Sequence, residues 1–541
     1  MASTPGGIRR MLPEFRALDM APLLAAVGGV FVNLQALTVR RVEDAMALLL
    51  MSWDNASHFN IFHMQRIHGT VLPLAGQSSD ASRWALSDYP QGFHSVMVLL
   101  SEMARSTPPD VWKAEVVTFS NFSAIMNILI VVLVISAVCS LPSLRRSPVV
   151  GFPIAVFVAS GWLFGFGALA SMHGFSNFLF TAAMVAAAIV LGQSMTRVLD
   201  PIPLFAVGAC VSAVMQNWVL LGVFLIPSVL AVLLVTPKGR WKMSPRDILI
   251  ALLMLVLVTF SAVTAAGQLL TVKADSILYA TGGVPPLDFG LLLALLGILG
   301  CAGIVLIGRN GGLHDDVRRI NWSLSAIWVG VIVAVGMGIA QVVKNGTLSY
   351  YMIKFSIALS LLVLLGIALA TAGLLGRRQE TSDRAPTKNP KKMIAASVVA
   401  SLGLTQFFGF IFPLQEMGMP ASAESGITTA RQETSLKEGS MAGGRLLQAV
   451  RDSEGLVGPV MYLTTNPGEV DPILAQQWFD SLRASYSEHS WNLSLNMFPL
   501  SHGIDSLRPV VLAIREEDPK AQIVVDPENQ EALDLVLAEI G

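Results

Sequence analysis

The run YYMIKFSIALSLLVLLGIALATAGL, residues 350–374, carries a single charged side chain, Lys354. A helix needs about 20 consecutive apolar residues to cross the hydrocarbon core of a bilayer, so this run is long enough to span one. Comparable runs recur from residue 19 to residue 413, and 53% of the chain is hydrophobic while 13% is charged. That charged fraction is about half the value of an ordinary soluble domain. The sequence therefore predicts an all-α polytopic membrane protein.

The apolar runs predict about eleven transmembrane helices. Their expected bounds are 19–39, 116–141, 149–170, 177–195, 201–217, 218–236, 247–267, 288–308, 322–343, 350–374 and 393–413. Basic residues gather in alternate loops and are almost absent from the others, which by the positive-inside rule predicts a cytoplasmic N-terminus. With an odd number of spans, the segment after residue 413 lies on the extracytoplasmic side. The net charge of -1 gives no indication of nucleic-acid binding.

The chain is expected to have two parts, residues 1–413 in the membrane and residues 414–541 as a small soluble α/β domain. In the second part, the apolar runs 457–463 and 509–514 favour strands. Three segments there favour helices, at about 441–453, 472–486 and 528–539. In the first part, residues 40–115 form a long polar extracytoplasmic loop, where we expect interfacial helices and the chemistry of the protein.

The most informative part of that loop is Ser52-Trp53-Asp54-Asn55-Ala56-Ser57-His58-Phe59. If a helix begins with Ser52 as its N-cap and ends before Gly69, spacings of three and four residues place one set of side chains on a single face. They are Asp54, His58, Ile61, Gln65 and His68. An acid and an imidazole one turn apart can together take a proton from a hydroxyl nucleophile. An interfacial amphipathic helix whose polar face meets water explains the same pattern.

Metal binding is another interpretation of these side chains, because Asp54, His58 and His68 are all ligand types. However, His58, His63 and His68 recur every five residues, a spacing that does not stack them on one helical face. Neither a nearby cysteine nor a His-x-x-x-His pair adds further ligands. We therefore expect no metal and no other resident cofactor, with a divalent cation as the alternative.

Two other motifs lie at predicted membrane edges. The segment Tyr89-Pro90-Gln91-Gly92-Phe93-His94 joins a proline turn to a glycine, an aromatic ring and a histidine before an apolar run. It is typical of the start of a re-entrant or interfacial helix, or of a plain surface helix. Tyr350-Tyr351-Met352-Ile353-Lys354 opens the span 350–374. Such residues usually anchor a helix at the interface, but a lysine that faces the bundle can neutralise a lipid-linked phosphate.

Together these features resemble the GT-C superfamily of membrane glycosyltransferases. The similarity covers the architecture: a first span, a long outer loop, many further spans and an outer C-terminal domain. It also covers three motifs: the acidic Asp54 soon after the first span, the Tyr-Pro-x-Gly-aromatic segment at 89–93, and Tyr350-Tyr351-x-x-Lys354, which is similar to an element of related sugar transferases. The closest similarity is to actinobacterial arabinofuranosyltransferases, which build cell-wall polysaccharides from polyprenyl-phosphate sugars.

The resemblance implies an inverting glycosyltransferase of the plasma membrane. It would move a sugar, arabinofuranose in the closest comparison, from a polyprenyl-phosphate donor to an envelope glycan or glycolipid on the outer face. Asp54 would be the catalytic base with His58 beside it, and the donor phosphate would be held by Tyr350, Tyr351 and Lys354. The other residues expected near the substrate cleft are Gln65, His68, Tyr89, His94, His173 and Lys273.

A transporter or flippase of lipid-linked saccharides is the rival interpretation. Transporters usually carry ionisable residues and broken helices near the bilayer midplane, whereas the mid-span segments here are nearly free of charge. An anchored sensor would not need about eleven spans. The sequence therefore favours an interfacial enzyme whose partners are the lipid bilayer, a lipid-linked donor and a glycan acceptor.

Overall fold

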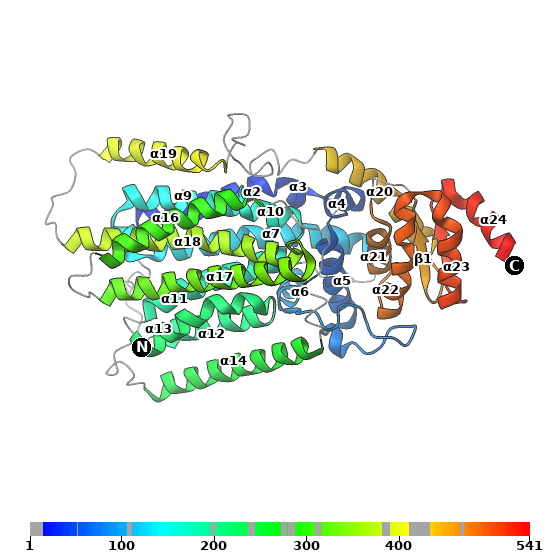
Figure 1. Ribbon diagram of the computed structural model, residues 1–541, viewed down its shortest axis with the longest axis horizontal. Helices are drawn as coiled ribbons and strands as arrows, with labels where there is room; N and C mark the ends of the chain where they lie inside the picture. Colours follow the sequence, from blue (N-terminus) through cyan, green and yellow to red (C-terminus); the bar gives the residue numbers. More distant parts are fainter. Residues whose placement is uncertain are drawn as a thin grey trace, which may run out of the picture.

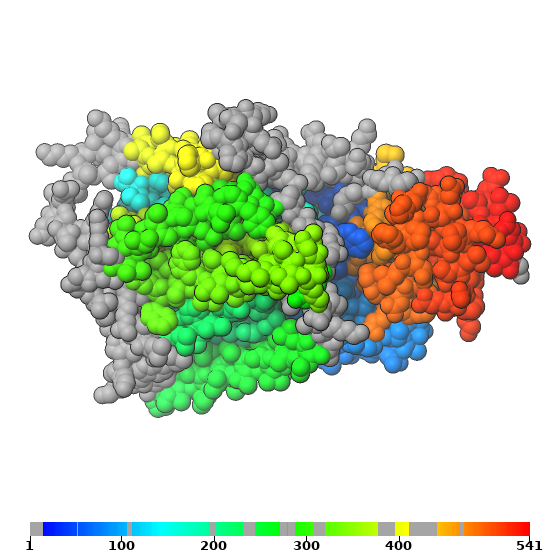
Figure 2. All heavy atoms as spheres, viewed as in Figure 1, coloured from blue at the N-terminus to red at the C-terminus, as the bar shows by residue number. Residues whose placement is uncertain are grey.

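The computed structural model describes the following residues: 15–50, 52–104, 111–195, 201–235, 244–271, 279, 287–308, 315–380, 390–410, 433–465 and 470–540. Within them the chain is mainly helical. The long helices run side by side along the long axis of the molecule as one bundle, and helix α5 (Trp53–His68) runs across one end of that bundle (Figure 1). The C-terminal residues form a lobe beyond α5 (Figure 1), which is orange and red in Figure 2.

Seven helical segments in the described residues are long and apolar enough to cross a membrane. They are formed by α7 (Trp112–Ser140), α9 (Pro148–Leu163) with α10 (Phe166–Met172), α11 (Ser176–Met195), α14 (Pro245–Thr271), α16 (Phe289–Gly308), α17 (Asp315–Asn345) and α18 (Tyr350–Glu380). Each coincides with a predicted span. This confirms a helical polytopic membrane protein, by the length and composition of its helices.

The other four predicted spans coincide with shorter apolar helices. They are α2 (Met20–Val32), α12 (Pro201–Met215), η3 (Val219–Leu225) with α13 (Ile226–Val235), and α19 (Pro390–Phe407). The number of eleven spans and the orientation in the membrane therefore stay predictions. The predicted boundary between the two parts of the chain, near residue 413, lies outside the described residues.

Helices α18 and α14 show how the bundle is layered. Each of these helices contains an apolar stretch of 18 residues that could cross a membrane. In α18, 83% of this stretch is buried inside the protein, whereas in α14 only 11% is buried. The exposed side chains of α14 include Leu253, Val256 and Phe260. An apolar helix covered on all sides belongs at the centre of a bundle, and an exposed apolar surface is what a helix presents to lipid. We therefore assign α18 to the centre and α14 to the periphery.

In the residues that the structure describes, the C-terminal lobe combines a small sheet with five α-helices and short 3₁₀-helices. Strands β1 (Val460–Leu463) and β2 (Gln522–Val525) pair in parallel, with Val460 opposite Gln522. The helices are α20 (Glu433–Asp452), α21 (Pro472–Leu482), α22 (Glu488–Ser494), α23 (Leu507–Glu517) and α24 (Gln530–Ile540). The predicted strand at 457–463 and the helices near 441–453, 472–486 and 528–539 each coincide with an element of this lobe.

The predicted strand at 509–514 is wrong, because these residues lie in α23. The buried side chains of α23 are Leu507, Val510, Val511 and Ile514. Their spacing of three and four residues is the helical repeat, and the prediction overlooked Leu507, which begins it. The partner of β1 is instead β2, whose residues no prediction covered.

The lobe is joined to α5 by direct contacts. The ring of Trp478 on α21 stacks on Phe59 of α5, with ring centroids 5.5 Å apart. The amide Nε2 of Gln477 donates a hydrogen bond to the Ser57 hydroxyl at 2.7 Å. Phe59 and Trp478 also belong to one buried apolar cluster shared by α4 (Val42–Leu49), α5, α7, α20 and α21. Helix α5 is therefore held between the bundle and the C-terminal lobe.

Candidate functional site

Helix α5 begins and ends where the sequence predicts. Ser52 is its N-cap residue, and Gly69 ends it in the left-handed conformation, with φ 64°. Glycine adopts that conformation without the steric cost that a side chain brings. Asp54 lies in the first turn, where the partial positive charge of the helix N-terminus favours a carboxylate.

Asp54 meets two residues from the start of α18. The Lys354 ammonium Nζ donates to Asp54 Oδ2 at 2.7 Å, and the Tyr350 hydroxyl donates to Oδ1 at 2.9 Å and to Oδ2 at 3.0 Å. Nζ also lies 2.9 Å from the Tyr350 hydroxyl oxygen. Three of the residues singled out in the sequence thus form one hydrogen-bonded group, which we call the Asp54 trio, although Asp54 is far along the chain from the other two.

Aromatic rings surround the lysine of the trio. Lys354 Nζ lies 3.9 Å from the centroid of the Phe175 ring and 5.9 Å from that of Trp218. The Trp218 ring in turn stacks on Tyr351, with centroids 6.1 Å apart and an angle of 5° between the planes. The faces of aromatic rings attract a cation, so these rings favour the ammonium in a place with little water. Tyr351 therefore contributes to the wall of the site rather than to the trio itself.

The two charges of the trio differ in their access to solvent. The side chain of Lys354 is 3% exposed, and that of Asp54 is 21% exposed. A carboxylate with this exposure can still meet a molecule that arrives from outside, whereas the ammonium is reached only past its neighbours. The geometry therefore offers an accessible acid beside a buried cation.

The turn before α11 fits closely under the start of α5. Gly174 has φ 75°, and a Cβ added to it would lie 2.5 Å from Ser52 Oγ and 2.7 Å from Asn55 Oδ1. Only glycine combines this backbone conformation with such a close approach. The turn also brings Phe175, the next residue, against Lys354. Gly174 is thus a structural requirement of the site.

His58 does not bond to Asp54 within the described residues, although the two lie one turn apart. Its Nδ1 lies 3.0 Å from Nε2 of His94, so one imidazole donates a hydrogen bond to the other. Burial lowers the pKa of His58 to about 3, and the positive charge of Lys354 adds to this shift. His58 is therefore a neutral imidazole at physiological pH, and its direct partner is His94 rather than the acid.

The Tyr89–His94 segment is held beside this histidine pair. The Tyr89 ring lies 6.0 Å from that of His58, and its hydroxyl accepts a 2.7 Å hydrogen bond from Asn177 Nδ2 on α11. Helix α6 (Gly92–Ala104) begins directly after the turn, and the Gly92 amide donates to the carbonyl of Gln216 at 3.0 Å. Nothing in the sequence singled out Asn177, which is fully buried between these elements.

The structure does not bring Gln65 and His68 to the trio. Gln65 bonds to Gln91 at 3.0 Å, and the His68 ring lies 5.3 Å from Trp84. At about 1.5 Å of rise per residue, His68 is about 21 Å along the axis from Asp54. The helical repeat shows which residues share a face, and for this reason the sequence grouped these two with Asp54. Residues on one face can still be far apart along the helix.

His173 and Lys273 are the last two residues that the sequence placed near the substrate cleft. His173 Nδ1 lies 2.9 Å from the carbonyl oxygen of Leu169, and its ring lies 5.6 Å from that of Phe175. It therefore stands behind Phe175, outside the trio. Lys273 lies outside the described residues, as does most of the loop 268–287 that was expected to cover the site.

Metal binding finds no support in the part of the chain that the structure describes. No group of three or more histidine, cysteine, aspartate or glutamate side chains there is arranged to hold a metal ion. Asp54 and His58 each have a different protein partner. The expectation that the protein needs no metal stays a prediction.

Comparison with known proteins leaves the family open. No protein-family model matches the chain, and no match was found among curated proteins. The resemblance to GT-C glycosyltransferases therefore stays a prediction that rests on the architecture and the three motifs.

Proposed function

We propose that this protein transfers a sugar from a polyprenyl-phosphate donor to a hydroxyl group of a glycan or glycolipid acceptor, with inversion at the anomeric carbon. The observation that carries the proposal is the Asp54 trio. Transfer of this kind needs a base for the acceptor proton and a cation for the charge that develops on the leaving phosphate. Asp54 and Lys354 are a carboxylate and an ammonium in direct contact.

The reaction follows from these two roles. The acceptor oxygen attacks the anomeric carbon from the face opposite the phosphate, and its proton passes to Asp54. The bond between the anomeric carbon and the phosphate oxygen breaks, and its electron pair leaves with the polyprenyl phosphate. Lys354 and the Tyr350 hydroxyl stabilise the negative charge on that phosphate by hydrogen bonds.

The contacts of the trio also suggest that the donor binds before the Asp54 carboxylate becomes free. Without substrate, Lys354 and Tyr350 both donate to Asp54. A donor phosphate that takes these hydrogen bonds releases the carboxylate, which then accepts the acceptor proton. The base is therefore uncovered only after the donor has bound.

The position of the trio supports a lipid-linked donor. Lys354 lies about one turn from the start of α18 and contacts Asp54 in the first turn of α5. Helix α5 runs across one end of the bundle (Figure 1). A phosphate attached to a lipid lies at the edge of the hydrocarbon layer, the level expected for the first turn of a spanning helix. The transferred sugar, arabinofuranose by resemblance, and an extracytoplasmic plasma-membrane site remain part of the proposal.

A transporter of lipid-linked saccharides is the second candidate. The burial of Lys354 favours it, because ionisable residues inside membrane helices often mark a transport pathway. Yet the Asp54–Lys354 ion pair lies at the N-terminal end of α18, against α5, instead of in the middle of the span. This placement favours an interfacial transferase.

The test uses the full-length protein in lipid nanodiscs with a panel of labelled polyprenyl-phosphate sugars and envelope glycan acceptors. We expect Asp54→Asn to lower turnover by about a thousandfold or more while donor binding persists, since general-base catalysis contributes about a hundredfold to ten-thousandfold. Asp44→Asn, the same change at an exposed position of α4, is the matched control and should keep its turnover. Wild-type turnover in Asp54→Asn would refute the proposal. Lipid movement across vesicles without sugar transfer would favour the transporter.

A further inference from the structure

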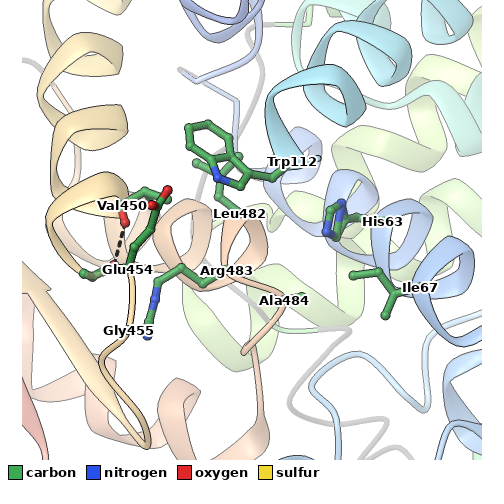
Figure 3. A pocket seen from close by; sticks show the side chains of 10 residues that line it. His63, Ile67, Trp112, Val450, Glu454, Gly455, Leu482, Arg483 and Ala484 are labelled. Carbon is green, nitrogen blue, oxygen red and sulfur yellow. Dashed lines mark hydrogen bonds between the residues drawn. The ribbon is translucent and has the colours of Figure 1, made fainter. Parts of the chain in front are cut away.

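A cavity of about 330 Å³ lies between α5 and the C-terminal lobe (Figure 3). Its walls include His63 and Ile67 from α5, Trp112 from the start of α7, and Glu454 and Arg483 from just after α20 and α21. Neither the Asp54 trio nor the proposed transfer reaction uses any of these residues.

The cavity lies away from the Asp54 trio. His63 follows Asp54 by about two and a half helical turns, which places it about 14 Å along α5 and on the opposite face. One helix thus presents the trio on one side and the cavity on the other. The cavity is a second site and not an extension of the first.

Two buried polar groups in the cavity wall have unused hydrogen-bonding capacity. His63 is 2% exposed, and its Nδ1 finds no hydrogen-bond partner among the described residues. Arg483 donates from Nη2 to the Leu456 carbonyl at 3.0 Å, while its buried Nη1 has no partner in the same residues. A buried polar group without a partner costs free energy, and both of these groups belong to side chains that line the cavity.

The chemistry of the wall indicates the type of ligand. Arg483 supplies hydrogen-bond donors, and Glu454, on the open side, supplies acceptors. Burial, with a contribution from the charge of Arg66, lowers the pKa of His63 to about 3, so its imidazole is neutral and can donate or accept. Trp112 adds an aromatic surface. A ligand that is simply anionic would meet the Glu454 carboxylate, whereas a ring of hydroxyl groups with an apolar C–H face uses all of these groups.

We infer that this cavity binds a sugar ring of the glycan acceptor, at a distance from the bond that forms at Asp54. The inference rests on the proposed function for the identity of the glycan, but binding itself does not require transfer. Because the cavity and Asp54 lie on opposite faces of α5, one sugar unit cannot occupy both. The acceptor is therefore an oligosaccharide that passes around the helix, with one ring held by the lobe.

The experiment measures binding by titration calorimetry on the full-length protein in nanodiscs without any donor. The probes are a linear arabinofuranose pentasaccharide and a linear mannopyranose pentasaccharide. We expect at least one to bind, and Arg483→Met and Glu454→Gln each to weaken its binding by about tenfold, the loss of one charged hydrogen bond. Glu454 is exposed, so its variant stays informative if Arg483→Met fails to fold. Arg508→Met, at an exposed arginine of α23, should bind like wild type.

The outcomes separate this inference from the proposed function. Unchanged binding in both cavity variants, or no binding of either probe by the wild type, overturns the sugar-binding cavity even if transfer occurs. Binding that depends on Arg483 and Glu454 supports the cavity even if no donor sugar is transferred. Binding of inorganic phosphate alone would also overturn it, because the ligand would then be an anion.

Discussion

The Asp54–Lys354 ion pair leads to an asymmetric effect on stability. In Lys354→Met, the remaining carboxylate keeps its hydrogen bonds from Tyr350 and is 21% exposed, so water can replace the ammonium. We expect a loss of about 1–3 kcal/mol in the free energy of unfolding. In Asp54→Ala, the remaining ammonium is 3% exposed, and the expected loss is about 3–5 kcal/mol, as for a buried pair that loses one partner.

The assay is a double-mutant cycle. The free energy of unfolding is measured in mixed micelles, by tryptophan fluorescence against added denaturing detergent, for wild type, both single variants and the double variant. The double variant should lose less than the sum of the single variants, with a coupling energy of about 1–3 kcal/mol. Tyr350→Phe distinguishes the hydroxyl contribution from that of the ammonium. A coupling energy near zero, or a larger loss in Lys354→Met than in Asp54→Ala, would refute this account of the pair.

Two further predictions concern the packing of α5. Gly174→Ala should lower the free energy of unfolding by about 2–4 kcal/mol, because the new Cβ would approach Ser52 Oγ to 2.5 Å in a left-handed conformation, whereas Gly69→Ala, with no atom within 4 Å, should lose only about 1 kcal/mol. Equal losses in denaturant titrations would contradict the close approach. Burial and the charge of Arg66 lower the pKa of His63 from 6.5 to about 3, so between these values the unfolded chain binds more protons and stability falls as the pH decreases. His63→Gln should reduce this dependence in pH-resolved unfolding curves, and a pH dependence equal to that of the wild type would contradict the effect.

Much of the Asp54 trio could be predicted because its signals are local. Ser52 and Gly69 mark the ends of α5, and the edge of the apolar run 350–374 places Tyr350 and Lys354 in the first turn of a span. The segment around Asp54 and the Tyr350–Lys354 segment therefore both lie at the ends of helices, where chain segments from different spans meet. The helical repeat also gave the faces of α5 but not the distances along it, so it grouped His68 with Asp54.

The rest of the site depends on contacts between distant segments. The aromatic wall around Lys354 requires Phe175, from the turn before α11, and Trp218, from the turn before η3, to approach α18, and no short pattern encodes that approach. The cavity beside His63 exists only because the C-terminal lobe packs on α5. In the same lobe, the run 509–514 has the composition of a strand, and burial at the helical spacing makes it a helix instead.

The most direct test of the proposed transfer is a structure of the protein with a non-transferable polyprenyl-phosphonate sugar analogue. We expect the phosphonate oxygens to lie within hydrogen-bond distance of Lys354 Nζ and the Tyr350 hydroxyl. We also expect the Asp54 carboxylate to be released from both and to face the anomeric carbon on the side opposite the phosphonate. A phosphonate bound elsewhere, with the Asp54 trio unchanged, would contradict the proposed roles of these residues.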